Sequence, residues 1–200
     1  MFVQVIQGKV TDPDAVKQAM DAWERDLKPG SIGFLGSTSG ISPDGELFVA
    51  ARFSSEKDAR ANSDRPEQGQ WWASIEKGLS DVLFHDCTEI DEFMSGGSDD
   101  AGFVQVIQGK VTDVERAREL DRKMAGDLPS SRPDILGGYT AWHPQNGRYT
   151  QVVYFTSEAE ARKNEKAMAD DPQMQAYFEE YQRITDGESH YIDLPTPRLT

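Results

Sequence analysis

The 200-residue sequence has little cysteine and no long apolar run. Cys87 is its only cysteine, so no disulfide can form within the chain, as is typical of a reducing compartment. No apolar run approaches the roughly 20 residues that span a bilayer. The first residues, MFVQVIQGKV, lack the basic flank and long apolar stretch of a signal peptide. We therefore expect a cytoplasmic protein with no membrane partner.

Basic residues and cofactor motifs are scarce as well. The chain has 21 Lys and Arg against 35 Asp and Glu, a formal net charge of −14. Binding to a phosphate backbone requires clustered Lys and Arg, so we expect no nucleic-acid partner. There is no GxGxxG, phosphate-loop or HExxH motif, and the three histidines are not spaced as metal ligands. We expect no cofactor and no metal.

What the sequence does contain is a repeat. The stretch FVQVIQGKVTD occurs at 2–12 and again at 103–113. In each copy it is followed by a helical stripe of apolar residues, two apolar runs joined by a turn (SPDG and HPQNG), a second helix and a closing strand. Pro66 and the DDPQ stretch at 170–173 predict a break in each second helix. The predicted order is β-α-β-β-α-β, twice, which is the ferredoxin-like unit.

The repeat also predicts the domain organisation. We expect a first repeat over 1–94, a linker over 95–102 rich in Gly, Ser and Asp, and a second repeat over 103–200. A four-stranded sheet with both helices on one face leaves its other face bare, and a second copy would cover it. The fold class is therefore α+β, with two antiparallel sheets paired into an intramolecular α/β barrel. We expect a monomer by this pseudo-dimeric fold, or a weak homodimer.

This pattern resembles the dimeric α/β-barrel superfamily, and within it proteins related to antibiotic biosynthesis monooxygenases. The resemblance rests on the element order, the repeated strand and the stretch FSSEKDARANSDRPEQGQWWASI, and it covers 2–93 and 103–195. It implies a small-molecule ligand. Members include cofactor-independent oxygenases, haem-degrading enzymes and proteins of no known activity, so the fold does not fix a reaction.

The resemblance also suggests site residues. Oxygenases of this family use an Asn and a Trp, and sometimes a Tyr or His, around a pocket between sheet and helices. The matching residues are Asn62, Trp71 and Trp72 in the first copy and Tyr177 in the second. An Asn amide can hold a ligand oxygen, and an indole can stack on an aromatic ring. In the alternative interpretation Trp72 belongs to the core stripe and Asn62 caps or breaks a helix.

Three further residues complete the predicted site. His85, in the last strand of the first copy, is a candidate base near neutral pH. Arg52 lies among apolar neighbours on one strand face, where a guanidinium requires an acidic, carbonyl or anionic partner. Tyr154 is its equivalent in the second copy. We thus predict Asn62, Trp72 and His85 as catalytic residues, and Arg52, Trp71, Tyr154 and Tyr177 as ligand-binding residues.

Two functions from different classes follow. The first is a small-molecule-binding protein, in its fullest form a cofactor-independent oxygenase that acts on an aromatic or polyketide-like substrate. The second is a non-enzymatic binding or assembly module whose pockets are filled by its own side chains. Haem degradation is a third alternative, which lacks a clearly placed axial histidine. The volume and lining of the space between sheet and helices distinguish the first two.

Overall fold

The computed structural model describes residues 1–143, 145–169 and 171–200. Its chain divides into two units, Met1–Thr88 together with Arg198–Thr200, and Glu89–Pro197. Two predicted features, the HPQNG turn and the DDPQ helix break, each contain a residue that lies outside the described residues, Pro144 and Asp170.

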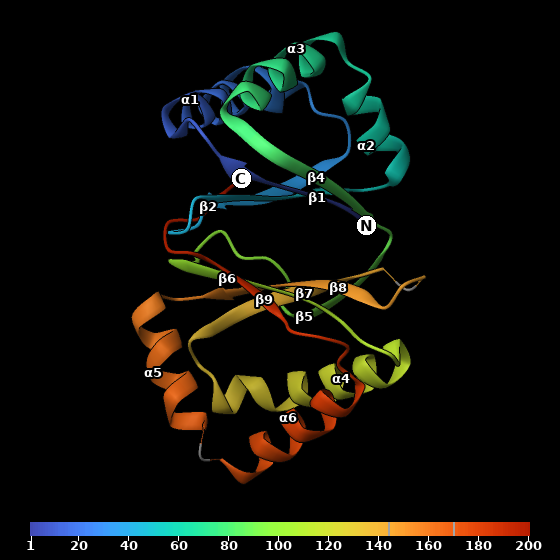
Figure 1. Cartoon of the computed structure of the whole chain (residues 1–200), viewed down its shortest axis with the longest axis vertical. Coiled ribbons are helices and arrows are strands. Elements are labelled where there is room, and N and C mark those ends of the chain that lie inside the picture. Colours follow the sequence, from blue (N-terminus) through green and yellow to red (C-terminus); the bar gives the residue numbers. More distant parts are fainter. Residues whose placement is uncertain (144, 170) are drawn as a thin grey trace. The chain divides into compact units, whose positions relative to one another are not determined.

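Unit 1 follows the predicted element order (Figure 1). Its elements are β1 (Phe2–Val10), α1 (Pro13–Ala22), a π-helical turn (Trp23–Leu27), a 3₁₀ turn (Lys28–Gly30), β2 (Phe34–Ile41), β3 (Glu46–Phe53), α2 (Glu56–Ser63), α3 (Pro66–Ile75), a 3₁₀ turn (Glu76–Gly78), β4 (Leu79–Cys87) and, from the end of the chain, β10 (Arg198–Leu199). The predicted break at Pro66 is confirmed, because α2 ends at Ser63 and Pro66 begins α3.

Unit 2 repeats this order. Its elements are β5 (Glu89–Met94), β6 (Phe103–Lys110), α4 (Val114–Ser131), β7 (Ile135–His143), β8 (Arg148–Phe155), α5 (Glu158–Met168), α6 (Pro172–Ile184) and β9 (His190–Leu194).

Each unit holds one five-stranded antiparallel sheet, with the orders β10-β2-β3-β1-β4 and β5-β7-β8-β6-β9. Four consecutive strands of each sheet, β2-β3-β1-β4 and β7-β8-β6-β9, have the ferredoxin-like order. The fifth strand is exchanged: β5 follows β4 in the chain but joins the second sheet, and β10 follows β9 but joins the first. The α+β fold of two ferredoxin-like repeats is confirmed.

The predicted closed barrel requires a correction. The described strands form two separate sheets instead of one continuous cylinder. The edge strands are the reason: β4 and β10 each pair with a single neighbour in the first sheet, and β9 and β5 do so in the second. A sheet whose two edges remain unpaired cannot close on itself.

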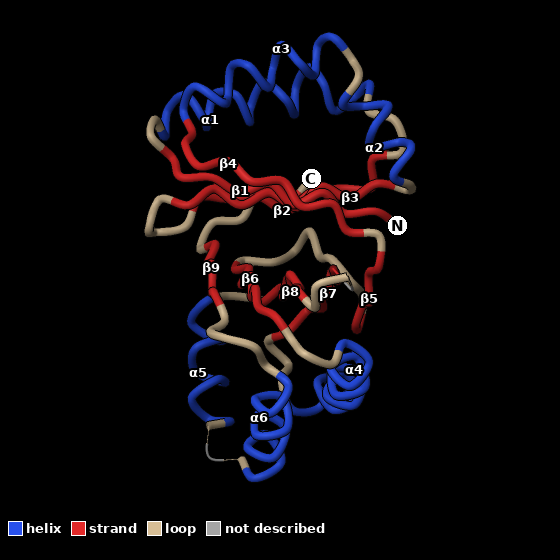
Figure 2. Tube along the Cα trace, turned by 45° about the vertical axis from the view of Figure 1, so that its right-hand side comes forward, coloured by secondary structure: helices blue, strands red, loops and turns tan. Residues whose placement is uncertain are grey.

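The helices of each unit cover one face of its sheet, α1, α2 and α3 in unit 1 and α4, α5 and α6 in unit 2 (Figure 2). The starts of α1 and α4 are fixed by side-chain caps. Asp12 accepts a hydrogen bond from Ala15 N at 3.0 Å, and its counterpart Asp113 accepts one from Arg116 N at 2.9 Å. The caps establish that α1 and α4 correspond residue by residue at a spacing of 101 positions.

Apolar side chains between helices and sheet form a core in each unit. In unit 1, Val16, Leu47 and Ile75 are buried in one cluster. In unit 2, Phe103 and Phe155 are buried with Leu128. Within the described residues, no helix has the length and apolar character needed to cross a membrane.

Candidate functional site

Each unit has a cavity between its helices and its sheet, and the two differ greatly in size. The cavity of unit 1, here the first cavity, has a volume of about 100 Å³. The cavity of unit 2, the second cavity, has a volume of about 750 Å³. Ligand pockets commonly enclose about 300–1,000 Å³, so only the second has room for an organic molecule of several rings.

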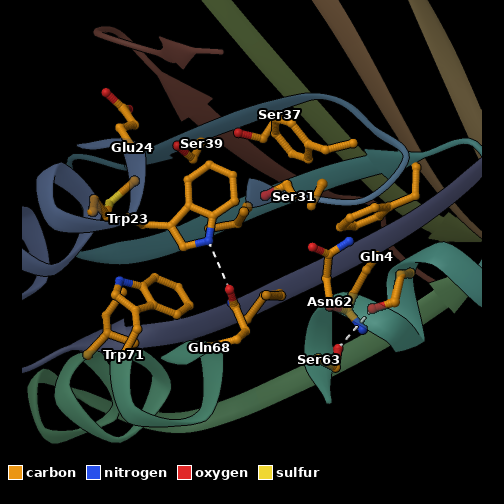
Figure 3. A pocket seen from close by; sticks show the side chains of 18 residues that line it. Gln4, Trp23, Glu24, Ser31, Ser37, Ser39, Asn62, Ser63, Gln68 and Trp71 are labelled. Atoms are coloured by element: carbon orange, nitrogen blue, oxygen red, sulfur yellow. Dashed lines mark hydrogen bonds between the residues drawn. The ribbon is translucent and has the colours of Figure 1, made fainter. Parts of the chain in front are cut away.

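Two tryptophans account for the small volume of the first cavity (Figure 3). The Trp23 indole donates a hydrogen bond to Oε1 of Gln68 at 3.2 Å, and that of Trp71 donates one to the carbonyl of Ala19 at 2.7 Å. The two ring centroids lie 6.5 Å apart. Because both N–H groups already have protein acceptors, neither indole has a donor left for a ligand.

Asn62 also lines the first cavity, but its amide is occupied by the protein. Its Oδ1 accepts from the backbone N–H of Ile32 at 3.0 Å, and its Nδ2 donates to the carbonyls of Ile32 at 2.7 Å and Asp58 at 2.9 Å. A primary amide has two N–H donors, and both are used. Asn62 therefore clamps the loop that leads into β2.

Trp72, His85 and Arg52 do not line the first cavity. Trp72 packs in the core cluster of unit 1, with its ring 5.0 Å from that of Phe84. His85 pairs with Val5 and thus lies on the sheet face opposite the cavity-lining Gln4. Arg52 likewise alternates with Ala51, which faces the cavity. The structure therefore leaves these three predicted residues outside the first cavity, which Asn62 and Trp71 line.

The second cavity is open because smaller side chains replace those that fill the first. Met124 occupies the position of Trp23 in the helix repeat. Pro66 and Pro172 begin α3 and α6, which places Met174 at the position of Gln68 and Tyr177 at that of Trp71. A thioether chain occupies less space than an indole, and it needs no hydrogen-bonding partner.

Tyr177 is the one predicted residue of the second copy that lines the second cavity. Tyr154 does not: it alternates along β8 with Gln151, Val153 and Phe155, which do face the cavity. Tyr154 is buried, and its position on the opposite face matches that of Arg52 in unit 1.

Asp121 is a site residue that the sequence argument missed. It lines the second cavity from α4, and the Tyr177 hydroxyl on α6 donates a hydrogen bond to its Oδ1 at 3.1 Å. Burial, followed by the negative charge of Asp91, raises the pKa of Asp121 to about 6, against the lowering effect of the Tyr177 hydrogen bond. Alignment of the two copies would have shown it, since the equivalent residue in α1 is the apolar Met20.

Two more tyrosines extend the polar wall of the second cavity. The Tyr181 ring centroid lies 5.7 Å from that of Tyr177 and 6.4 Å from that of Tyr149. Burial, and then the charge of Asp121, raises the pKa of both Tyr177 and Tyr181. Tyr149 is buried too, and burial raises its pKa. These phenols therefore stay protonated at neutral pH, as hydrogen-bond donors or acceptors.

Both units also carry a polar cluster that connects helix and sheet. Gln4 donates to Oδ1 of Asp86 at 3.1 Å, and Asp86 forms an ion pair with Arg60. The same three side chains recur in unit 2 as Gln105, Asp193 and Arg162. Their presence beside both a filled cavity and an open one indicates a structural role.

Cys87 and the potential metal ligands offer no further chemistry. Burial, with a contribution from Asp86, raises the pKa of the Cys87 thiol to about 12, which is the opposite of what a nucleophile needs. Within the part of the chain that the structure describes, no three His, Cys, Asp or Glu side chains are grouped so that they could hold a metal ion.

No protein-family model matches the chain, and no curated protein matches it. Solved structures do match over nearly its whole length. A candidate monooxygenase from Fusobacterium nucleatum matches with a TM-score of 0.78 at 10% identity, covering 99% of this chain and 93% of its own. Another, from Lactobacillus acidophilus, gives 0.72 at 13%, covering 98% and 94%.

A third match is an anthrone oxidase-like protein, with a TM-score of 0.70 at 9% identity, covering 100% of this chain and 92% of its own. At such identities the likeness shows the fold alone. The predicted resemblance is therefore confirmed for the fold: the chain is a tandem pair of ferredoxin-like units, built as in monooxygenase-like proteins.

Proposed function

We propose that this chain binds an aromatic or polyketide-like small molecule in the second cavity and oxygenates it without a bound cofactor. The observation that carries the proposal is an opening of about 750 Å³ in which a buried carboxyl, Asp121, and the phenols of Tyr149, Tyr177 and Tyr181 converge among apolar side chains. The likeness in fold to candidate monooxygenases and to an anthrone oxidase-like protein supports oxygenation as the reaction class.

The chemistry needs a base and a dry site. A methylene group activated by an aromatic ring and a carbonyl loses a proton to a base, and the carbanion transfers electrons to dioxygen as a C–O bond forms. Loss of water from the resulting hydroperoxide leaves a second carbonyl, so that CH₂ and O₂ become C=O and H₂O. The apolar side chains of the lining support these steps because they limit the water around the reactive anion.

The first cavity supports the rival interpretation for its own unit. Trp23 and Trp71 fill it, and their hydrogen bonds to Gln68 and Ala19 are internal. We therefore propose that unit 1 has a structural role and that the ligand binds in unit 2. This proposal therefore differs from the predicted site, to which Asn62, Trp71, Trp72 and Arg52 of the first copy contribute.

The test uses a position at which the two units carry different residues, Met124 in unit 2 and Trp23 in unit 1. Met124→Trp places an indole where unit 1 already accommodates Trp23, so the variant is expected to fold with a filled second cavity. Binding of 1,8-dihydroxyanthrone is measured by thermal shift, and its oxygenation by an oxygen electrode. We expect saturable binding and oxygen uptake in the wild type and a loss of both of at least about tenfold in Met124→Trp.

Trp23→Met is the matched control, since it opens the first cavity and leaves the second unchanged. It is expected to bind and oxidise the anthrone as the wild type does. Absence of saturable binding to the wild type, or equal binding by Met124→Trp, would overturn the proposal and favour the non-enzymatic interpretation.

A further inference from the structure

We infer that Tyr177 and Asp121 form a proton relay in the second cavity, in which the Tyr177 hydroxyl takes the substrate proton as it passes its own to Asp121, and that the substrate is an uncharged weak acid. This inference rests on the proposed function, because it names the base and the substrate class of the same cavity.

The geometry assigns the two roles. Tyr177 lines the cavity, and its hydroxyl lies 3.1 Å from Oδ1 of Asp121. The other carboxyl oxygen, Oδ2, is buried and has no hydrogen-bond partner among the described residues. A ligand therefore reaches the carboxylate through the phenol, and the proton ends on Oδ1. The O–H or C–H bond of the substrate and the O–H bond of Tyr177 break, and new O–H bonds form on Tyr177 and on Oδ1 of Asp121. The negative charge moves from Asp121 to the substrate.

The groups around Asp121 leave its carboxylate able to accept a proton, because no cation among the described residues stabilises its ionised form. Asp91 on β5 is the acid whose negative charge acts on it, and Asp91 itself accepts hydrogen bonds from Arg118 and from the Trp142 indole, each at 2.8 Å. Tyr177 and Tyr181 approach it from α6. No cation is paired with Asp121 within the described residues. With its pKa at about 6, the carboxyl is ionised at neutral pH and takes up a proton more readily than an exposed aspartate would.

The charges of the lining define the substrate class. Of the described residues that line the second cavity, Arg132 is the only Lys or Arg. Its Nε and Nη2 donate to the carboxylate of Asp134 at 3.0 and 2.7 Å, and its Nη1 contacts Sδ of Met168 at 3.7 Å, so its charge is already paired. The carboxylates of Glu165 and Glu188 lie at the same wall. An anionic ligand would find no free cation there, whereas a neutral molecule with a phenolic O–H or an activated C–H would find an acceptor for its proton.

The relay is confined to one unit. The first unit has Met20 at the position of Asp121 and Trp71 at that of Tyr177, so it has neither a base nor a relay. The same comparison shows that α1 accepts a methionine at this position without loss of the helix, which supplies a variant that is expected to fold.

The test separates binding from proton transfer. 1,8-Dihydroxyanthrone is bound to the full-length chain without oxygen, and ionisation of the bound probe is followed by its visible absorption from pH 5 to pH 9 in stopped flow. We expect the rate of anion formation in the wild type to rise with pH through a midpoint near 6. Asp121→Asn should lose this dependence and slow the rate about 100-fold, while thermal shift shows binding within about threefold of the wild type.

Two further variants keep the outcome decisive. Tyr177→Phe leaves the carboxylate but removes the relay, so it should slow anion formation by a similar factor. Asp121→Met replaces Asp121→Asn if the latter does not fold. Anion formation at the wild-type rate in the variants that bind the probe would overturn the relay and leave the proposed function intact. A wild type that binds no probe would overturn both.

Discussion

The hydroxyl of Tyr177 on α6 donates a hydrogen bond to Oδ1 of Asp121 on α4 across 3.1 Å. The equivalent residues of unit 1, Trp71 and Met20, cannot make this bond. The two units thus share an order of helices and strands, but they differ in the side chains that α4 and α6 present where unit 1 has α1 and α3. That difference leads to the following predictions.

The carboxyl of Asp121 makes the chain's stability depend on pH. Unfolded, it ionises near 3.8, whereas in the native state it keeps its proton up to about pH 6. The native state therefore binds more protons between these values, and its stability falls as pH rises through them, by roughly 2–3 kcal/mol. The free energy of unfolding in urea, measured for wild type and Asp121→Asn, should show this decline in their difference between pH 4 and pH 6. A difference that is flat or rises with pH would contradict it.

Asn62 and Asn164 occupy equivalent positions after the Ser55 and Ser157 caps, yet their substitution should have unequal effects. Asn62→Ala leaves the backbone N–H and carbonyl of Ile32 without partners, at a cost of about 2–4 kcal/mol.

Among the described residues, Asn164 donates one hydrogen bond, to the carbonyl of Glu160 at 3.0 Å. Asn164→Ala should therefore cost less than about 1 kcal/mol. Urea unfolding of both variants measures the contrast, and equal losses would show that the clamp on Ile32 is not a source of stability.

Trp23 fills the first cavity, so its removal should enlarge that cavity at a cost in stability. Trp23→Met loses the edge contact with Phe34, at a centroid distance of 5.1 Å, and the hydrogen bond to Gln68. We expect a loss of about 2–3 kcal/mol. The double variant with Gln68→Met, which reproduces the pair in unit 2, should lose less than the sum of the two single changes. Additive losses in urea unfolding would argue against a shared cavity.

Cys87 should be inert in the folded chain. With its pKa raised to about 12, only about one thiol in ten thousand is ionised at pH 8, and the thiolate is the reactive form. A disulfide reagent such as 5,5′-dithiobis(2-nitrobenzoate) should label the native chain at least about 100-fold more slowly than the chain in urea. Prompt labelling of the native chain at pH 8 would show that the thiol is accessible.

Much of the architecture could be predicted from the sequence because it depends on local chemistry. The repeated strand FVQVIQGKVTD, the SPDG turn and the proline that begins α3 each act within a few residues, and the elements that they predict are present. The exchange of β5 and β10 between the two sheets could not be predicted in this way, because strand pairing joins residues far apart in the chain.

The two ferredoxin-like repeats follow from the amino-acid sequence alone, since periodicity and turn residues specify elements directly. The sequence also contained Asp121 and Met20 at matching places, but without showing that they face a cavity. Which unit has an open cavity depends on tertiary packing, because Trp23 and Gln68 fill the first cavity and Met124 leaves the second unfilled. Cavity volume and the pKa of a buried carboxyl depend on how side chains from several elements meet, and no single stretch of sequence contains that information.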